Sequence, residues 1–110
     1  MSRVSVLLFA ASDQIDAGRG VEDAYHQISR SLSGTPGLLG NTLLEQVETP
    51  GRFVVLSEWE SLEAFRTWEE GPDHRQLTAP LRPYHDRSMA GGFGVYRVAA
   101  EYRNWEVPGG

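Results

Sequence analysis

The sequence predicts an α+β fold of the ferredoxin-like type, with the element order β-α-β-β-α-β and a four-stranded antiparallel sheet that carries two helices on one face. Two observations support this prediction. Four short apolar segments bounded by glycine- or proline-containing turns are typical of strands, and segments with helical spacing lie between them. The 110 residues suffice for a single domain, which we place at residues 1–102, followed by a C-terminal tail at residues 103–110.

The first half of the chain provides a strand, a helix and a second strand. Residues 4–11 (V-S-V-L-L-F-A-A) form an apolar run typical of a strand. Residues 21–32 repeat apolar side chains at spacings of four, three and four, which places them on one helix face. Gly34 and the T-P-G turn at residues 35–37 end this helix, and residues 38–47 alternate loosely as the second strand.

The second half repeats this order after a hairpin. The E-T-P-G sequence at residues 48–51 leads into a third strand at residues 52–59, and Ser61 is a suitable N-cap for a second helix. Asp73 is placed to cap a continuation of that helix, which two prolines must kink or break, and Gly91-Gly92 introduces a last strand at residues 93–102.

Composition excludes several classes of protein. The net charge is −5, and all ten cations are scattered arginines, so a nucleic-acid binder is not expected. Without cysteine the chain has no disulfide, thiolate zinc site or iron–sulfur cluster. The longest apolar run is far too short to span a membrane, and only Arg3 precedes it, unlike the basic start of a signal peptide. We therefore expect a cytoplasmic protein without a membrane partner.

Both faces of the predicted sheet are apolar. On the third strand, Val55 and Trp59 point to one side, whereas Val54 and Leu56 point to the other. A sheet with helices on one face and water on the other would be polar on the second face. The pattern therefore predicts a homodimer that buries the second face. The alternative is that the C-terminal tail covers it.

Three segments of the chain resemble the antibiotic biosynthesis monooxygenase family: T-P-G-L-L-G-N-T-L-L at residues 35–44, F-V-V-L-S-E-W-E-S-L-E-A-F-R-T-W at residues 53–68, and D-H-R at residues 73–75. The resemblance implies a small dimeric ferredoxin-like α+β barrel. Members with similar sequences oxidise polyketide anthrones or naphthols to quinones in antibiotic biosynthesis, without flavin or metal. The implied function is thus a cofactor-independent monooxygenase that acts on a polycyclic aromatic substrate with molecular oxygen.

The resemblance also assigns roles to single residues. Trp59 matches a tryptophan that lines the substrate pocket of the polyketide oxygenases. Val55 stands where those enzymes carry an asparagine, and Phe65 where they carry a tyrosine. These two replacements leave open a non-catalytic or accessory, cyclase-like protein that binds an aromatic intermediate. Trp68 matches a tryptophan of the heme-degrading branch, so heme binding with His74 is a third possibility.

Cofactor-free oxygenation needs a dry aromatic slot, a proton acceptor and hydrogen-bond donors. Candidate catalytic residues are Trp59 and two histidines, His74 and His85, between which the sequence does not choose. On an unbroken helix these histidines would be roughly 16 Å apart, so they do not predict a shared metal ion. The substrate-binding candidates are Tyr25, Val55, Ser57, Phe65, Trp68, Tyr84 and Tyr96.

Overall fold

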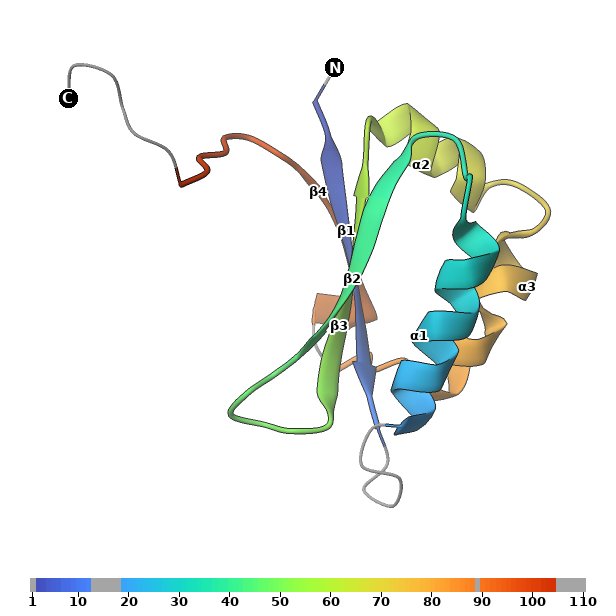
Figure 1. Cartoon of the computed structure of the whole chain (residues 1–110), viewed down its shortest axis with the longest axis vertical. Helices are drawn as coiled ribbons and strands as arrows, with labels where there is room; N and C mark the ends of the chain where they lie inside the picture. The colour runs from blue at the N-terminus through green and yellow to red at the C-terminus, as the bar shows by residue number, and fades with distance from the viewer. Residues whose placement is uncertain (1, 13–18, 89, 105–110) are drawn as a thin grey trace.

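A computed structural model of the chain describes residues 2–12, 19–88 and 90–104, and these residues form one sheet covered by helices on one face (Figure 1). In chain order the elements are β1 (Val4–Ala11), α1 (Arg19–Leu32), β2 (Leu38–Glu45), β3 (Arg52–Trp59), α2 (Leu62–Glu69), α3 (His74–Thr78), two 3₁₀ helices (Ala79–Tyr84 and Ala90–Gly92) and β4 (Phe93–Arg97).

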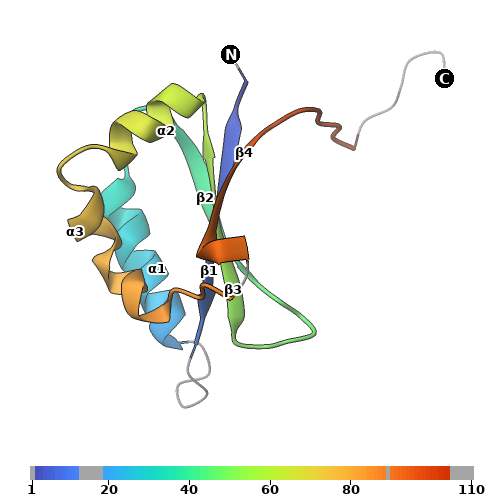
Figure 2. The ribbon, with the colours of Figure 1, turned by 180° about the vertical axis from the view of Figure 1, so that it is seen from behind.

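The sheet has the strand order β2-β3-β1-β4, and all its neighbouring strands are antiparallel. Helices α1, α2 and α3 lie on one side of the sheet in both views, and none of the three lies on the other side (Figures 1 and 2). The predicted ferredoxin-like α+β fold is confirmed. Three helices cover the sheet, one more than predicted, because the segment after α2 restarts as the separate helix α3.

Two strands end earlier than predicted because their partner strands end. Strand β4 stops at Arg97, which pairs with Val4, the first residue of β1. Beyond this pair, a single backbone bond from the Val98 amide to the Arg3 carbonyl continues the ladder. Strand β2 stops at Glu45, which pairs with Phe53 next to the hairpin turn.

The N-cap of α2 makes the predicted hydrogen bond, whereas that of α3 does not. The Ser61 hydroxyl accepts a hydrogen bond of 3.1 Å from the Ala64 amide, as an N-cap should. Asp73 occupies the N-cap position of α3, as predicted, but the expected capping bond is absent. Asp73 has helical backbone angles, φ −92° and ψ −11°, and its carboxylate makes no capping bond. The predicted break at the prolines is confirmed, because the α-helix ends at Thr78 and a 3₁₀ helix containing Pro80 and Pro83 follows.

The core lies between the sheet and the helices, in two clusters. The larger cluster joins α1 to the lower half of β1, to β3 and to the 3₁₀ helix; its buried members are Ala10, Val21, Ala24, Ile28, Leu32, Phe53 and Leu81. The smaller cluster joins the other end of the sheet to α2, through Val4, Val6, Trp59 and Phe65. The partly buried Trp68 packs against both clusters. The space between these two clusters is where a cavity opens.

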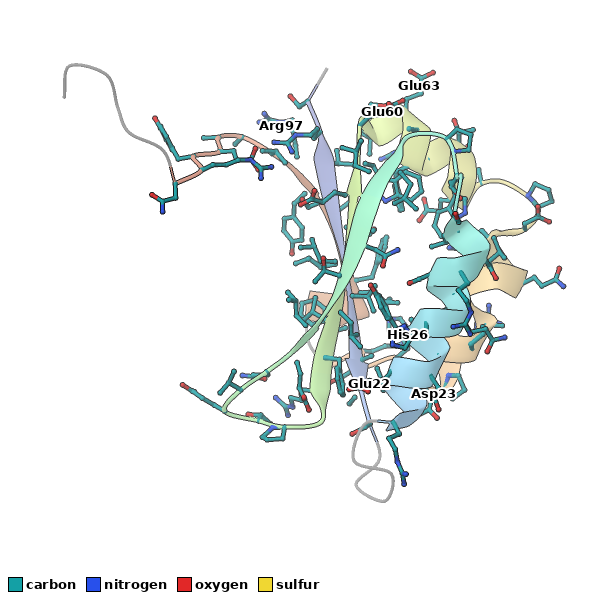
Figure 3. The ribbon with its side chains drawn as sticks, in the orientation of Figure 1. Glu22, Asp23, His26, Glu60, Glu63 and Arg97 are labelled. Atoms are coloured by element: carbon teal, nitrogen blue, oxygen red, sulfur yellow. The ribbon has the colours of Figure 1, made fainter. Side chains whose placement is uncertain are left out.

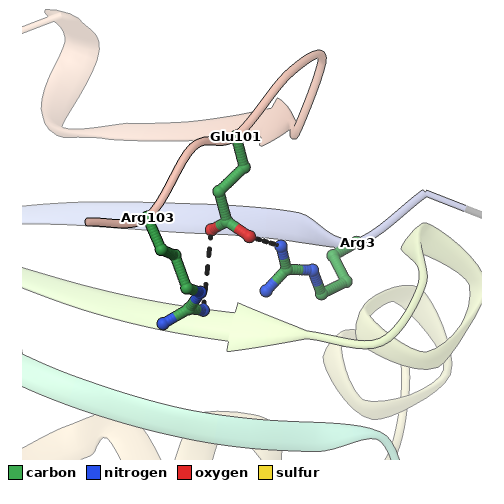
Figure 4. Close-up of polar contacts among 3 residues, drawn as sticks. All are labelled: Arg3, Glu101 and Arg103. Carbon is green, nitrogen blue, oxygen red and sulfur yellow. Dashed lines mark hydrogen bonds and ion pairs between the residues drawn. The ribbon is translucent and has the colours of Figure 1, made fainter. Parts of the chain in front are cut away.

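The helix-free face of the sheet is apolar along its middle. Leu7 pairs with Leu56, and Phe9 pairs with Val54 on the neighbouring strand. The described part of the C-terminal tail runs away from the sheet (Figures 1 and 2). An ion pair ties Glu101 to Arg3, and Arg103 lies 3.7 Å from the same carboxylate (Figure 4). Tyr102 is 85% exposed, so it does not cover this face, and Trp105 lies outside the described residues.

Candidate functional site

A cavity of about 780 Å³ lies between the sheet and the helices. Strands β1, β2 and β3 form its floor, and α1, α2, α3 and the first 3₁₀ helix form its walls. This volume is within the range of pockets that bind drug-sized organic molecules. The lining is mostly apolar, with a few polar groups at defined positions, which is the usual composition of a small-molecule site.

Four aromatic rings form one wall. The ring of Trp59 lies 5.5 Å from that of Phe65 and 5.4 Å from that of Trp68, measured between centroids. Phe93 on β4 extends the wall, 6.3 Å from Phe65. Trp59 is only 1% exposed, and its Nε1 donates a hydrogen bond of 3.0 Å to the Ser57 hydroxyl. Trp59 is thus both a core residue and part of the cavity wall.

His74 begins α3 and lines the cavity beside this wall. Its ring meets Trp68 edge to face, with centroids 4.5 Å apart. Burial lowers the pKa of His74 below its usual value of 6.5; the Glu69 carboxylate raises it, and the guanidinium groups of Arg82 and Arg75 lower it further. The imidazole is therefore neutral at pH 7 and able to accept a proton.

His85 also lines the cavity, but one of its nitrogens holds the backbone. Its Nε2 lies 2.9 Å from the Gly92 carbonyl oxygen, and since a carbonyl only accepts, Nε2 carries the proton. The contact is close: a side chain at Gly92 would place its Cβ 2.5 Å from this nitrogen, and Gly92 has φ +86°. The His85 side chain thus stabilises the turn that leads into β4 through this hydrogen bond.

A polar cluster on the opposite side of the cavity was missed by the sequence analysis. Asn41 on β2 and Ser29 on α1 line the cavity with Tyr25, and both hydroxyls bond to the Asn41 side chain. The available signal was the alternation of β2, which places Asn41 on the same face as Leu43. The hydrogen bonds themselves depend on how α1 packs on β2, which local sequence does not specify.

The cavity brings together eight of the ten predicted site residues: Tyr25, Val55, Ser57, Trp59, Phe65, Trp68, His74 and His85. Tyr84 is not among the lining residues and packs instead against the larger core cluster. The prediction that Tyr96 points toward the pocket is wrong. Tyr96 pairs with Ser5, which puts it on the helix-free face, where its ring lies against Gly94.

Two further properties of the described chain bear on its function. Among residues 2–12, 19–88 and 90–104, no three histidine, aspartate or glutamate side chains gather in a way that could hold a metal ion. The helices in these ranges are also too short or too polar for any of them to cross a lipid bilayer.

A ferredoxin-like sheet with an aromatic cavity beneath its helices defines an α+β domain whose pocket has the size and composition of a small-molecule site. Comparison with known families gives a more specific assignment. The chain belongs to the antibiotic biosynthesis monooxygenase family, whose sequence profile matches residues 6–79.

Relatives by sequence come from Streptomyces and from Mycobacterium. Protein SchA of Streptomyces halstedii is 33% identical over 104 residues, which are 93% of this chain and 27% of SchA. A mycobilin-producing heme oxygenase of Mycobacterium tuberculosis is 36% identical over 61 residues, 54% of this chain and 58% of that enzyme. The chain thus spans about a quarter of the first relative and little more than half of the second.

Among solved structures, SnoaB, a cofactor-independent oxygenase from Streptomyces nogalater, superposes with a TM-score of 0.72 at 20% identity. The alignment covers 96% of this chain and all of SnoaB. At this level of identity the likeness establishes the shared fold, and the chemistry has to be argued from the residues of the cavity.

Proposed function

We propose that this protein is a cofactor-independent monooxygenase that oxidises a polycyclic aromatic phenol or anthrone of polyketide type to a quinone. The observation that carries the proposal is the cavity itself, in which a neutral imidazole, His74, lies against a wall of aromatic rings. Family membership and the fold shared with a cofactor-independent oxygenase support it.

With an anthrone, the proposed reaction replaces a ring CH₂ group by a carbonyl and consumes one molecule of oxygen for each molecule of water formed; with a phenol, it replaces a ring C–H and the O–H by two carbonyls with the same use of oxygen. Removal of a proton gives an electron-rich anion, which passes one electron to O₂. The substrate radical and superoxide combine, a proton returns, and the resulting hydroperoxide loses water to leave the C=O group. The substrate supplies the electrons, so the protein has to orient it, exclude water and accept the first proton.

His74 fits the role of proton acceptor better than His85. Its pKa is held below 6.5 by burial, so the imidazole is unprotonated at neutral pH. It also lies directly against Trp68, where a flat substrate would stack. His85 is engaged through Nε2 with Gly92, and replacing it would disturb the turn as well as the chemistry.

The test is oxygen uptake by the purified protein with anthrone, in the presence of a chelator and without flavin. We expect uptake in the wild type and a loss of roughly 100-fold or more in His74→Gln. His26→Gln is the matched control. His26 belongs to α1 (Figure 3), is exposed and is not among the residues that line the cavity. Tryptophan quenching by anthrone without oxygen uptake would instead identify an accessory binding protein.

Heme is a second candidate substrate, favoured by one observation: His74, an imidazole able to bind iron, stands edge to face with Trp68 inside the cavity. The mycobacterial heme oxygenase among the relatives adds support. Titration with hemin tests it. A Soret band that is lost in His74→Ala but kept in His26→Ala would favour heme and contradict the anthrone proposal if no anthrone is consumed.

We also propose that two copies pair through the helix-free face, whose central row Leu7–Leu56 and Phe9–Val54 is only partly buried in the described residues and carries no α-helix. Sedimentation should give twice the chain mass of 12.2 kDa. Leu56→Glu should dissociate the dimer, whereas Leu62→Glu, the same change at an exposed position of α2, should not. A wild-type mass of one chain would contradict this.

A further inference from the structure

Two hydrogen bonds in the polar cluster of the cavity orient the side-chain amide of Asn41. Tyr25 and Ser29 are one helical turn apart on α1 and reach the same atom of Asn41 on β2. The Tyr25 hydroxyl donates to Asn41 Oδ1 at 2.5 Å, and the Ser29 hydroxyl donates to it at 3.1 Å. These two bonds occupy both lone pairs of the amide oxygen and fix the plane of the amide.

The amide nitrogen of Asn41 is left to bond elsewhere. It carries two N–H donors, and the structure shows no acceptor for them among the described residues. The nitrogen is not sealed inside the protein either. In the part of the chain that the structure describes, Trp68 Nε1 is the one buried side-chain nitrogen or oxygen without a partner. The Asn41 donors are therefore exposed to solvent, and Asn41 lines the cavity.

Ser57 presents a second donor next to them. Asn41 pairs with Ser57 across β2 and β3, so the two side chains stand on the same face, with Cβ atoms about 5 Å apart as in any such pair. The Ser57 oxygen accepts from Trp59 Nε1 at 3.0 Å, which leaves the hydroxyl proton to be donated. Both residues line the cavity. Apolar residues, Leu43 and Val55, form the next pair on this face of the sheet.

From this geometry we infer that Asn41 and Ser57 form a two-donor notch that binds one acceptor oxygen of the substrate, a carbonyl or phenolate. Tyr25, Ser29 and Trp59 are positioning residues, because they occupy the acceptor atoms of the notch and so direct its hydrogens toward the cavity. The inference rests on the aromatic substrate proposed above and narrows it to aromatic compounds that carry such an oxygen. Preorganised donors of this kind also stabilise an oxyanion that develops during a reaction.

The test compares two flat tricyclic probes, dihydroxyanthraquinone, which carries acceptor oxygens, and anthracene, which carries none. Their dissociation constants are measured by quenching of tryptophan fluorescence. The wild type should bind the quinone about tenfold or more tightly than anthracene. Asn41→Leu should weaken quinone binding by roughly 2- to 10-fold and leave anthracene binding unchanged, since one neutral hydrogen bond is lost.

Asn41→Asp is a second variant that tests the same donors if Asn41→Leu does not fold. Its carboxylate still accepts the bonds from Tyr25 and Ser29 but offers no N–H donor, so the preference for the quinone should fall as in Asn41→Leu. Ser29→Ala should reduce the preference less, and Ser31→Ala is its control, because Ser31 is exposed on the same helix and bonds to the Gln27 carbonyl. A purely structural role would not change the ratio of the two affinities.

The outcomes separate this inference from the proposed function. Equal affinity of the wild type for both probes, or an unchanged ratio in both Asn41 variants, would overturn the notch and leave the aromatic cavity standing. No binding of either probe would overturn the notch and the aromatic substrate together. A clear preference for the quinone in a protein that consumes no oxygen with anthrone would support the notch and overturn the oxygenase alone.

Discussion

Replacing Trp59 by phenylalanine tests how the cavity wall contributes to stability. Trp59 is 1% exposed, contacts Phe65 and Trp68, and donates its Nε1 proton to Ser57. Trp59→Phe keeps an aromatic ring in the core and removes the second ring and the donor. Both losses fall at the boundary between the smaller core cluster and the cavity.

Two contributions give the expected loss of unfolding free energy in Trp59→Phe. The smaller side chain buries about 40 Å² less apolar surface, which costs about 1 kcal/mol. Loss of the hydrogen bond from Trp59 Nε1 to Ser57 costs about 1 kcal/mol more. Since the vacated space joins an existing cavity, no sealed void adds to this cost. Trp59→Phe should therefore lower the free energy of unfolding by about 2 kcal/mol, and Ser57→Ala alone by about 1 kcal/mol.

Urea unfolding followed by far-ultraviolet circular dichroism measures these values, because fluorescence changes with the tryptophan itself. All variants are compared at one protein concentration, since pairing of chains would make stability depend on it. Ser57→Ala should cost almost nothing in the Trp59→Phe background, where its partner is already gone. A cost below about 0.5 kcal/mol for Trp59→Phe, or equal costs of Ser57→Ala in both backgrounds, would refute the described packing.

Three further predictions concern other parts of the fold. Burial lowers the pKa of His74 below 6.5, so just below that pH the folded state binds fewer protons than the unfolded state. The free energy of unfolding should therefore rise as the pH increases toward 6.5. Urea unfolding of His74→Gln at several pH values should lack this contribution. Gly37→Ala should cost clearly more than Gly34→Ala in the same assay, since both glycines have positive φ, +81° and +83°, but only at Gly37 would the new Cβ meet Ala64, at 2.4 Å. Ser61→Ala should lower the free energy of unfolding by about 1 kcal/mol through loss of the α2 cap, whereas Ser31→Ala, at an exposed position, should change it little.

Local signals were sufficient to predict most of the fold. The apolar runs placed β1 and β3 at their observed bounds, and Ser61 marked the start of α2 because its cap is a contact within four residues. The errors in element bounds occur where a strand distant in the sequence determines the end of an element. Strand β4 ends at Arg97 because β1 begins at Val4, and no local property of residues 98–102 contains that information.

The aromatic part of the site was predictable for the same reason that the core was. Phe65 and Trp68 lie on the apolar stripe of α2, and a stripe that faces the sheet must also face whatever space the sheet leaves open. Tyr96 was misplaced because the direction of a strand residue depends on register. A shift of one residue along β4 exchanges the two faces, and only the pairing of β4 with β1, in which Tyr96 lies opposite Ser5, determines the face of Tyr96.

The polar cluster shows why the chemistry of such a cavity is harder to predict than its shape. Asn41 takes its orientation from Tyr25 and Ser29, which precede it by 16 and 12 residues on a different element. Its neighbour in the cavity, Ser57, comes from a third element through strand pairing. None of the three contacts leaves a motif in the sequence, whereas Val55, at a position where the resemblance implies an asparagine, is evident at once. An apolar residue at one expected position therefore does not make the cavity apolar, because the fold can bring an amide to its surface from the adjacent strand.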